Sequence, residues 1–111
     1  MKKVDLSKYG FRKDFDPDNR FHLLTTVKYN GKKFKVSTVD LGLDHSFGFG
    51  PPLYYETMIF NDYQYYKEEN PFEWFQERYT TKKEAIAKHK EIVKAFKNEN
   101  FLEELRYYQN N

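Results

Sequence analysis

The residues best suited to chemistry are an adjacent pair, Asp44 and His45, and a glutamate further along, Glu56. A carboxylate can orient a histidine as a general base, and loops rich in Gly and Pro, like the one around Asp44, often carry functional residues. However, neighbouring side chains need not converge, and no Ser or Thr nucleophile stands in a recognisable motif. Asp44 can equally accept hydrogen bonds within its own turn, and Glu56 can pair with Arg78 or a lysine across a sheet. We therefore assign no catalytic residue, and a small hydrolase using Asp44, His45 and Glu56 is the third of three functional hypotheses.

Metal and cofactor sites have little support. Asp14, Asp16 and Asp18 alternate like the first ligands of a calcium loop, but Asn19 and Thr25 stand where that loop needs Gly and Glu. The histidines are scattered without an i, i+4 pair, cysteine is absent, and no phosphate-loop motif opens a helix. We predict neither a metal nor a cofactor.

Three lysines offer an electrostatic function instead. Lys28, Lys33 and Lys35 fall on one face of a predicted hairpin, near a lysine-rich helix, where they can follow a phosphate backbone. The net charge of +2 and the pI of about 8.6 are low for a dedicated nucleic-acid domain. Nucleic-acid binding is therefore the second hypothesis.

Aromatic residues make up 20% of the sequence and support the leading hypothesis. Many are needed as core, because the mean hydropathy of −0.97 is low for a folded chain. Others stand in polar or Gly-Pro loops and have no obvious buried place, and aromatic side chains supply large contact areas in protein interfaces. We predict that these residues bind another protein, or a second copy in a homodimer: Phe47, Phe49, Tyr63, Tyr65 and Tyr66.

The elements that must position these residues begin with a β-hairpin over 21–39. Asn30-Gly31 favours a type I′ turn, in which both central residues adopt positive φ. Pairing Tyr29 with Lys32 then places the apolar residues of both strands on one face and the lysines on the other.

A long loop and two more strands are predicted next. Residues 41–52 include three Gly and two Pro, which excludes extended regular structure. The run 53–60 is apolar on both alternating faces and predicts an inner strand covered on both sides. Residues 61–71 are predicted to form a polar loop and 72–79 a fourth strand. The aromatic residues expected in the core are Phe21, Phe34, Phe60, Trp74, Phe75 and Phe96.

Two helices are predicted after these strands. Thr81 and Glu84 form an S/T-x-x-E capping box, and apolar residues then recur at helical spacing. His89 lies on this apolar stripe, where we expect a hydrogen-bonded, partly buried imidazole. A second short helix is predicted from about Asn100, followed by a frayed tail at 109–111.

Strands followed by helices predict an α+β fold, with an antiparallel sheet of about four strands packed by one amphipathic helix and a short terminal helix. The length of 111 residues suits a single domain, with an irregular segment at 1–19. No apolar run approaches a membrane span, and Lys2-Lys3 is not followed by a signal-peptide stretch. We expect a cytoplasmic protein with no membrane partner and no disulfides.

Two sequence patterns stand out, one over residues 36–60 and one over residues 78–89. The first is V-S-T-V-x-L-G-x-D-H-x-F-G-x-G-P-P-L-x-x-E-T-M-x-F, and the second is R-Y-x-T-x-x-E-A-x-x-x-H. Together they resemble small uncharacterised bacteriophage and prophage proteins. The resemblance implies a phage or prophage setting, hence the host cytoplasm, and no mechanism. In that setting the leading hypothesis is a small non-enzymatic protein that binds a host or phage protein, for example as an inhibitor of host defence such as CRISPR.

Overall fold

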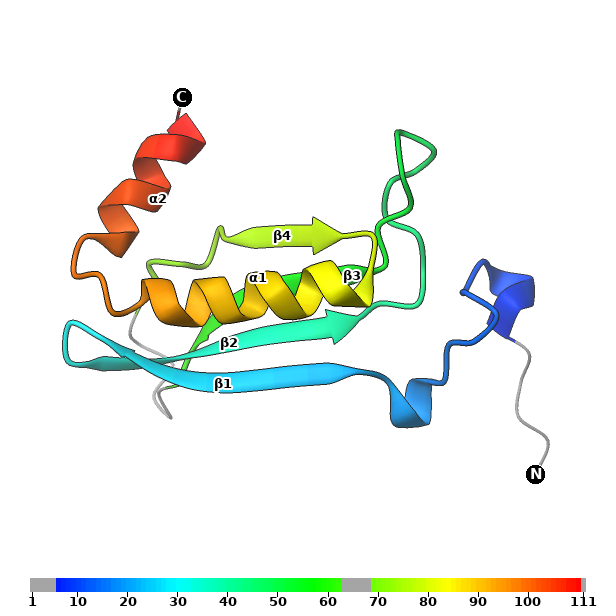
Figure 1. Cartoon of the computed structure of the whole chain (residues 1–111), viewed down its shortest axis with the longest axis horizontal. Helices are drawn as coiled ribbons and strands as arrows, with labels where there is room; N and C mark the ends of the chain where they lie inside the picture. The colour runs from blue at the N-terminus through cyan, green and yellow to red at the C-terminus, as the bar shows by residue number, and fades with distance from the viewer. Residues whose placement is uncertain (1–5, 63–68, 111) are drawn as a thin grey trace.

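The computed structural model describes residues 6–62 and 69–110 and contains one sheet with a helix across one of its faces (Figure 1). The sheet is antiparallel with strand order β1-β2-β3-β4, so each strand pairs with the next along the chain. The predicted α+β fold is confirmed. The elements are the 3-10 helices η1 (Leu6–Tyr9) and η2 (Pro17–Asn19), the strands β1 (His22–Tyr29), β2 (Lys32–Asp40), β3 (Tyr55–Asn61) and β4 (Gln76–Tyr79), and the helices α1 (Lys82–Ala95) and α2 (Phe101–Asn110).

The β1–β2 hairpin has the predicted turn and register. Asn30 has φ 50° and Gly31 has φ 77°, the left-handed values that a type I′ turn requires. Tyr29 lies opposite Lys32, and the pairing continues without a bulge along both strands. The register prediction is therefore confirmed, and it fixes which side chains of the hairpin face α1.

The prediction of a strand over 72–79 is wrong in its first half. The backbone turns at Phe72, where the Phe75 amide donates to the Phe72 carbonyl at 2.9 Å. The Asn70 side chain starts this turn by accepting from the Phe72 amide at 2.9 Å and donating to the Ile59 carbonyl at 2.8 Å. The turn directs the Phe72 ring into the core, so only β4 continues the sheet.

Phe72 is the centre of an aromatic core and is fully buried. Its ring centroid lies 5.1 Å from Phe34, 5.1 Å from Phe96 and 5.8 Å from Phe101. Tyr29 closes the cluster with an edge-on contact at 5.7 Å. Aromatic pairs in such arrangements contribute about 0.5–1.5 kcal/mol each beyond the area that they bury.

Two aromatic residues expected in the core are exposed instead. Phe60 is 45% and Trp74 is 36% exposed. Ile59 points toward α1, so Phe60 must point to the opposite face of the sheet, because side chains alternate along a strand. α1 contacts all four strands from one side, and within residues 6–62 and 69–110 no other helix or strand packs on the opposite side, so for the described part of the chain the prediction that the 53–60 run is covered on both sides is also wrong. We call the side away from α1 the open face.

Hydrogen bonds fix the start of each helix. The Thr81 hydroxyl accepts from the Glu84 amide at 3.1 Å, as predicted. The Tyr29 hydroxyl donates to the Glu99 carbonyl at 2.8 Å and accepts from the Leu102 amide at 3.1 Å, so it fastens the start of α2 to the hairpin. α2 ends at Asn110, so it includes residues 109 and 110 of the tail that was expected to fray. Neither helix is long and apolar enough to cross a membrane, nor is any other in the described ranges.

His89 of α1 is buried between the helix and the sheet, in a chain of hydrogen-bonded polar side chains. The prediction of a hydrogen-bonded imidazole at this position is confirmed. The His89 Nε2 is 2.8 Å from the Thr25 hydroxyl, and its Nδ1 is 2.7 Å from the Thr38 hydroxyl. The Thr38 and Thr57 hydroxyls are 2.6 Å apart, and the Tyr79 hydroxyl donates to Thr57 at 3.1 Å. These bonds satisfy polar groups that would otherwise be costly in the core.

We expect the protein to lose stability as the pH falls below about 6.5, because burial lowers the pKa of the His89 imidazole in the folded chain. The unfolded chain then binds a proton that the folded chain resists. The free energy of unfolding therefore decreases, by at most about 1.4 kcal/mol per pH unit. Urea unfolding between about pH 7.5 and about pH 5 measures this slope.

The control is a variant that keeps hydrogen-bonding capacity without the titration. His89→Gln can still bond Thr25 and Thr38, so its slope should be smaller than that of the wild type. Equal slopes in the wild type and His89→Gln would show that this imidazole is not responsible.

Candidate functional site

The loop between β2 and β3, residues 41–54, is held by the side chain of Asp44. One carboxylate oxygen accepts from the Ser46 amide at 2.8 Å and the Leu53 amide at 2.9 Å, and the other accepts from the Ser46 hydroxyl at 3.0 Å. The His45 amide donates to the Leu53 carbonyl at 2.9 Å. The two arms of the loop are thus joined across its base, and we call this segment the phenylalanine loop.

The electrostatics of Asp44 fit this structural role. The Leu53 and Ser46 amides lower the pKa of the Asp44 carboxyl, which therefore stays ionised at neutral pH. Both of its oxygens accept hydrogen bonds from the loop. Of the alternatives that the sequence left open for Asp44, the geometry favours the turn over an acid–base role.

Phe47 and Phe49 lie at the tip of the phenylalanine loop and are 80% and 87% exposed. Phe47 has φ 54°, a left-handed conformation that costs about 1–2 kcal/mol for a residue with a Cβ atom. The Phe49 amide donates to the Ser46 carbonyl at 3.0 Å, and the Phe47 ring packs edge-on against His45 at 6.4 Å. The loop projects beyond the sheet at the end opposite the β1–β2 turn (Figure 1). It therefore presents two apolar rings to solvent from a defined backbone.

Glu56 belongs to a different network from Asp44 and His45. Its Oε2 accepts from Gln76 Nε2 at 2.7 Å and from Arg78 Nε at 3.0 Å, across the β3–β4 pair. The sequence allowed for this ion pair with Arg78, and the structure contains it. Within the described ranges, no group of three or more His, Asp or Glu side chains is arranged to hold a metal ion.

The predicted nucleic-acid residues lie together on the open face. Lys28 stands directly opposite Lys33 in the β1–β2 pair, and Lys35 follows on the same face. The Lys35 ammonium is 3.4 Å from the Asp62 carboxylate, which offsets part of the positive charge. Lys28 and Lys33 thus place two like charges directly opposite each other, an arrangement that by itself disfavours a sheet.

Not every predicted protein-binding residue can be placed. Tyr63, Tyr65 and Tyr66 lie outside the residues that the structure describes. Phe47 and Phe49 are therefore the two predicted protein-binding residues whose surroundings are known, and both are exposed at the loop tip.

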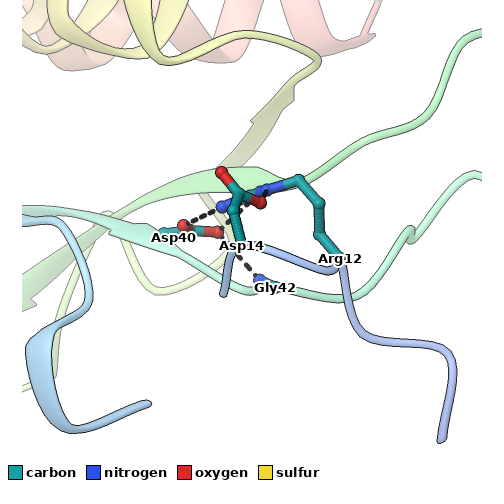
Figure 2. A network of polar contacts seen from close by, with 4 residues as sticks. All are labelled: Arg12, Asp14, Asp40 and Gly42. Atoms are coloured by element: carbon teal, nitrogen blue, oxygen red, sulfur yellow. Dashed lines mark hydrogen bonds and ion pairs between the residues drawn. The ribbon is translucent and has the colours of Figure 1, made fainter. Parts of the chain in front are cut away.

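Sequence reasoning missed a polar network at the base of the phenylalanine loop. Figure 2 shows the Arg12 side chain together with the carboxylates of Asp14 and of Asp40, the last residue of β2. Arg12 Nη1 and Nη2 donate to the two Asp40 oxygens at 3.2 and 2.5 Å, and Arg12 Nε donates to Asp14. The Gly42 amide donates to Asp40 Oδ1 at 2.9 Å. Asp40 thus holds both the N-terminal segment and the first turn of the loop.

The charges in this network reinforce one another. The hydrogen bond from Arg12 lowers the pKa of the Asp14 carboxyl, and the bond to Asp40 raises the pKa of the Arg12 guanidinium. The guanidinium carbon also lies 5.1 Å from the Tyr54 ring centroid and 5.6 Å from that of Tyr55. Cation–π contacts of this kind further stabilise the position of the Arg12 side chain.

The N-terminal segment also packs directly on the loop base. The Arg12 amide donates to the Gly42 carbonyl at 2.7 Å, and the Phe15 ring covers Gly42 so closely that a Cβ atom there would lie 2.6 Å from it. Phe11 pairs with Leu43 in an isolated β-bridge. No local spacing marks these contacts, because their partners are about thirty residues apart in the sequence.

The chain was compared with protein-family models, with curated proteins and with solved structures, and none of them matches it.

Proposed function

We propose that the chain is a small non-enzymatic binding protein whose partner is a protein that docks on Phe47 and Phe49. The observation that carries the proposal is the exposure of both rings, 80% and 87%, on a loop whose base is tied by Asp44 and Asp40. Exposed apolar patches mark interaction sites, and buried aromatic anchors dominate the energetics of most interfaces.

The bonding of the loop base supports this interpretation. A loop that is already ordered loses little conformational entropy when a partner covers its tip, so more of the contact energy appears as affinity. The left-handed backbone at Phe47 is strained, and strain of this type is concentrated in binding and active sites.

The phage setting is part of the proposal and is supported by the two patterns at 36–60 and 78–89. In that setting the partner is a host or phage protein in the host cytoplasm, and interference with a host defence system such as CRISPR is one activity that docking can produce. The hydrolase hypothesis has less support, because the carboxylates of Asp44 and Glu56 are each engaged in separate networks.

The test is capture of partners from the lysate of a bacterial host on the immobilised protein, followed by mass spectrometry. We expect a protein that binds the wild type but is lost from a variant carrying Phe47→Ala and Phe49→Ala. Direct titration with that partner should show a dissociation constant raised about thirtyfold or more. This is the effect expected when one or more hot-spot residues are removed from an interface. Phe60→Ala removes an exposed phenylalanine from the open face and is the matched control, which should bind normally.

Nucleic acid is a second candidate partner, favoured by the Lys28–Lys33 pair on the open face. The lysate experiment distinguishes a protein partner from a nucleic-acid partner, because capture of a protein that binds the loop directly does not change when the lysate is treated with nuclease. Retention on nucleic acid at low salt that falls in a triple variant, Lys28→Glu, Lys33→Glu and Lys35→Glu, would favour the second candidate. Unchanged retention in the triple variant would reject it, and capture unaffected by the two Phe changes would reject the leading proposal.

A further inference from the structure

The two edge strands of the sheet differ in how well they are protected. β1 and β4 stand at the ends of the strand order, and in the described part of the chain no further strand pairs with either. β4 has only four residues, two of which, Glu77 and Arg78, are charged. β1 has eight residues, no proline, glycine or bulge, and Lys28 as its only Lys, Arg, Asp or Glu. Proteins guard edge strands with such features because an unguarded edge pairs with other strands, so β1 is the edge open to a further strand.

The register of the hairpin shows which backbone groups of β1 point outward. The Asp40 amide donates to the Phe21 carbonyl at 3.0 Å, so residue 21 bonds toward β2. Along an antiparallel strand, residues alternate between bonding to the neighbouring strand and pointing away from it. The outward amides and carbonyls are therefore those of His22, Leu24, Thr26 and Lys28. Within residues 6–62 and 69–110, no group bonds to them.

A small hollow opens along the same edge, between β1 and α1. Its volume is about 250 Å³, below the roughly 300–1,000 Å³ typical of sites for small molecules. Its lining comes from three successive residues of β1 and from the end of α1 and the residues after it: Thr26, Val27, Lys28, Val93, Phe96 and Lys97. Successive residues of a strand point to opposite faces, so they border one hollow only around the outer edge, because β2 fills the inner one. Val27, Val93 and Phe96 give this hollow an apolar wall beside the unpaired strand.

We propose that two copies of this chain pair through antiparallel β1 strands, which joins their sheets into one sheet of eight strands. The two-fold axis passes beside Thr25, so that Leu24 of one copy faces Thr26 of the other and His22 faces Lys28. In this register all four outward residues of each strand exchange amide–carbonyl bonds with the second copy. A shift of two residues in either direction would leave His22 or Lys28 with no strand residue opposite it. A two-fold axis makes both halves of the interface identical, as in most homodimers.

The side chains of β1 favour a second copy as the occupant of this edge. On the α1 side, Leu23 of one copy lies opposite Val27 of the other, beside the apolar wall of the hollow. Leu23 is only partly buried in the single chain, so each copy supplies both an apolar side chain and the place that receives it. On the open face, Lys28 faces His22, and no lysine stands opposite another across the interface. Figure 1 shows β1 at one rim of the sheet and α1 over the inner strands, so the two helices do not meet.

The inference is independent of the proposed function, because the phenylalanine loop connects β2 and β3 and contributes nothing to the outer edge of β1. A variant with Phe47→Ala and Phe49→Ala should still form the dimer. Loss of partner capture and loss of dimerisation can therefore be told apart.

Sedimentation equilibrium over a range of concentrations is the first test. The average mass of the wild type should rise from 13.6 kDa toward twice that value as the concentration increases. Thr26→Pro removes an outward amide and no bond to β2, a position where an edge strand tolerates proline, and it should keep the monomer mass. Thr26→Val retains the amide and is the matched control, which should dimerise normally. A wild type that stays monomeric, or a Thr26→Pro variant that dimerises like the wild type, would overturn the proposal.

Disulfide trapping tests the register without depending on the proline variant, and the absence of cysteine from the sequence leaves no background reaction. Thr25→Cys places one cysteine beside the two-fold axis, opposite its own copy in a pair that is not hydrogen-bonded. The Cα atoms of such a pair are about 4.5 Å apart, which a disulfide can span. Oxidation should therefore link most of this variant into a covalent dimer. Leu23→Cys is the control and should give little, because its copy lies four residues further along the facing strand. A yield from Leu23→Cys equal to or above that from Thr25→Cys would contradict the pairing.

Discussion

Replacing Phe72 with alanine is expected to lower the free energy of unfolding by about 3–5 kcal/mol. The ring is fully buried and contacts four other aromatic rings, so the change removes transfer energy and leaves a cavity that rigid neighbours cannot close. Domains of this size are stabilised by about 5–15 kcal/mol in total, so the loss is a large part of the whole.

Urea unfolding followed by circular dichroism measures the change. Trp74→Ala is the matched control, because it removes a still larger aromatic side chain two residues away that is 36% exposed. It should cost clearly less than Phe72→Ala. Equal costs at the two positions would mean that Phe72 is not the centre of the core.

The second large effect is expected at Arg12. Arg12→Ala leaves the Asp40 carboxylate, whose side chain is only 8% exposed, with the Gly42 amide but without its two guanidinium bonds. An underbonded carboxylate in such a site costs about 2–3 kcal/mol. The base of the phenylalanine loop should loosen as well, so affinity for a partner that docks on the loop should fall although no contact residue has changed.

A double-mutant cycle separates the pair from the packing of the arginine stem. Arg12→Ala and Asp40→Ala together should destabilise by less than the sum of the single changes, with a coupling energy of about 1–3 kcal/mol. Arg20→Ala removes an exposed arginine from the same N-terminal segment and should change stability little. Additive effects of Arg12→Ala and Asp40→Ala would mean that the ion pair does not stabilise the fold.

Local rules were sufficient for the parts of the fold that depend on neighbouring residues. Asn30-Gly31 and the alternation around it determine the register of the hairpin, because a type I′ turn permits one pairing of its flanking residues. The Thr81 hydroxyl and the Glu84 amide define the start of α1 in the same way. Each of these features is decided within a few residues.

Local rules failed where the outcome depends on a distant part of the chain. The apolar run ending in Phe60 carries hydrophobic side chains on both faces, and nothing in it indicates that the helices cover one face alone. Phe72 continues an apolar pattern into β4, but Asn70 turns the chain toward a core made by other elements. Pattern alone cannot distinguish a strand from a turn that buries its aromatic residue.

The candidate site could be predicted from the sequence only in part. Gly and Pro around Phe47 and Phe49 predicted a loop, and both rings are exposed on it. The role of Asp44 was open, because the direction of its side chain depends on how the two arms of the loop meet at Leu53. The contact between Arg12 and Asp40 spans 28 residues and follows from no spacing rule.

The two ends of the described chain fasten to the same hairpin, and this has a consequence for the order of folding. The hairpin closes over a two-residue turn and needs no other element, so it is a natural nucleus. The bond from Arg12 to Asp40 closes a loop of 28 residues, whereas the bond from the Tyr29 hydroxyl to Glu99 spans 70. The entropy cost of closing a loop grows with its length. The contact between Arg12 and Asp40 can therefore form early, and the docking of α2 on Tyr29 is expected later. During synthesis on the ribosome, the base of the phenylalanine loop can thus be assembled long before the rest of the aromatic core arrives.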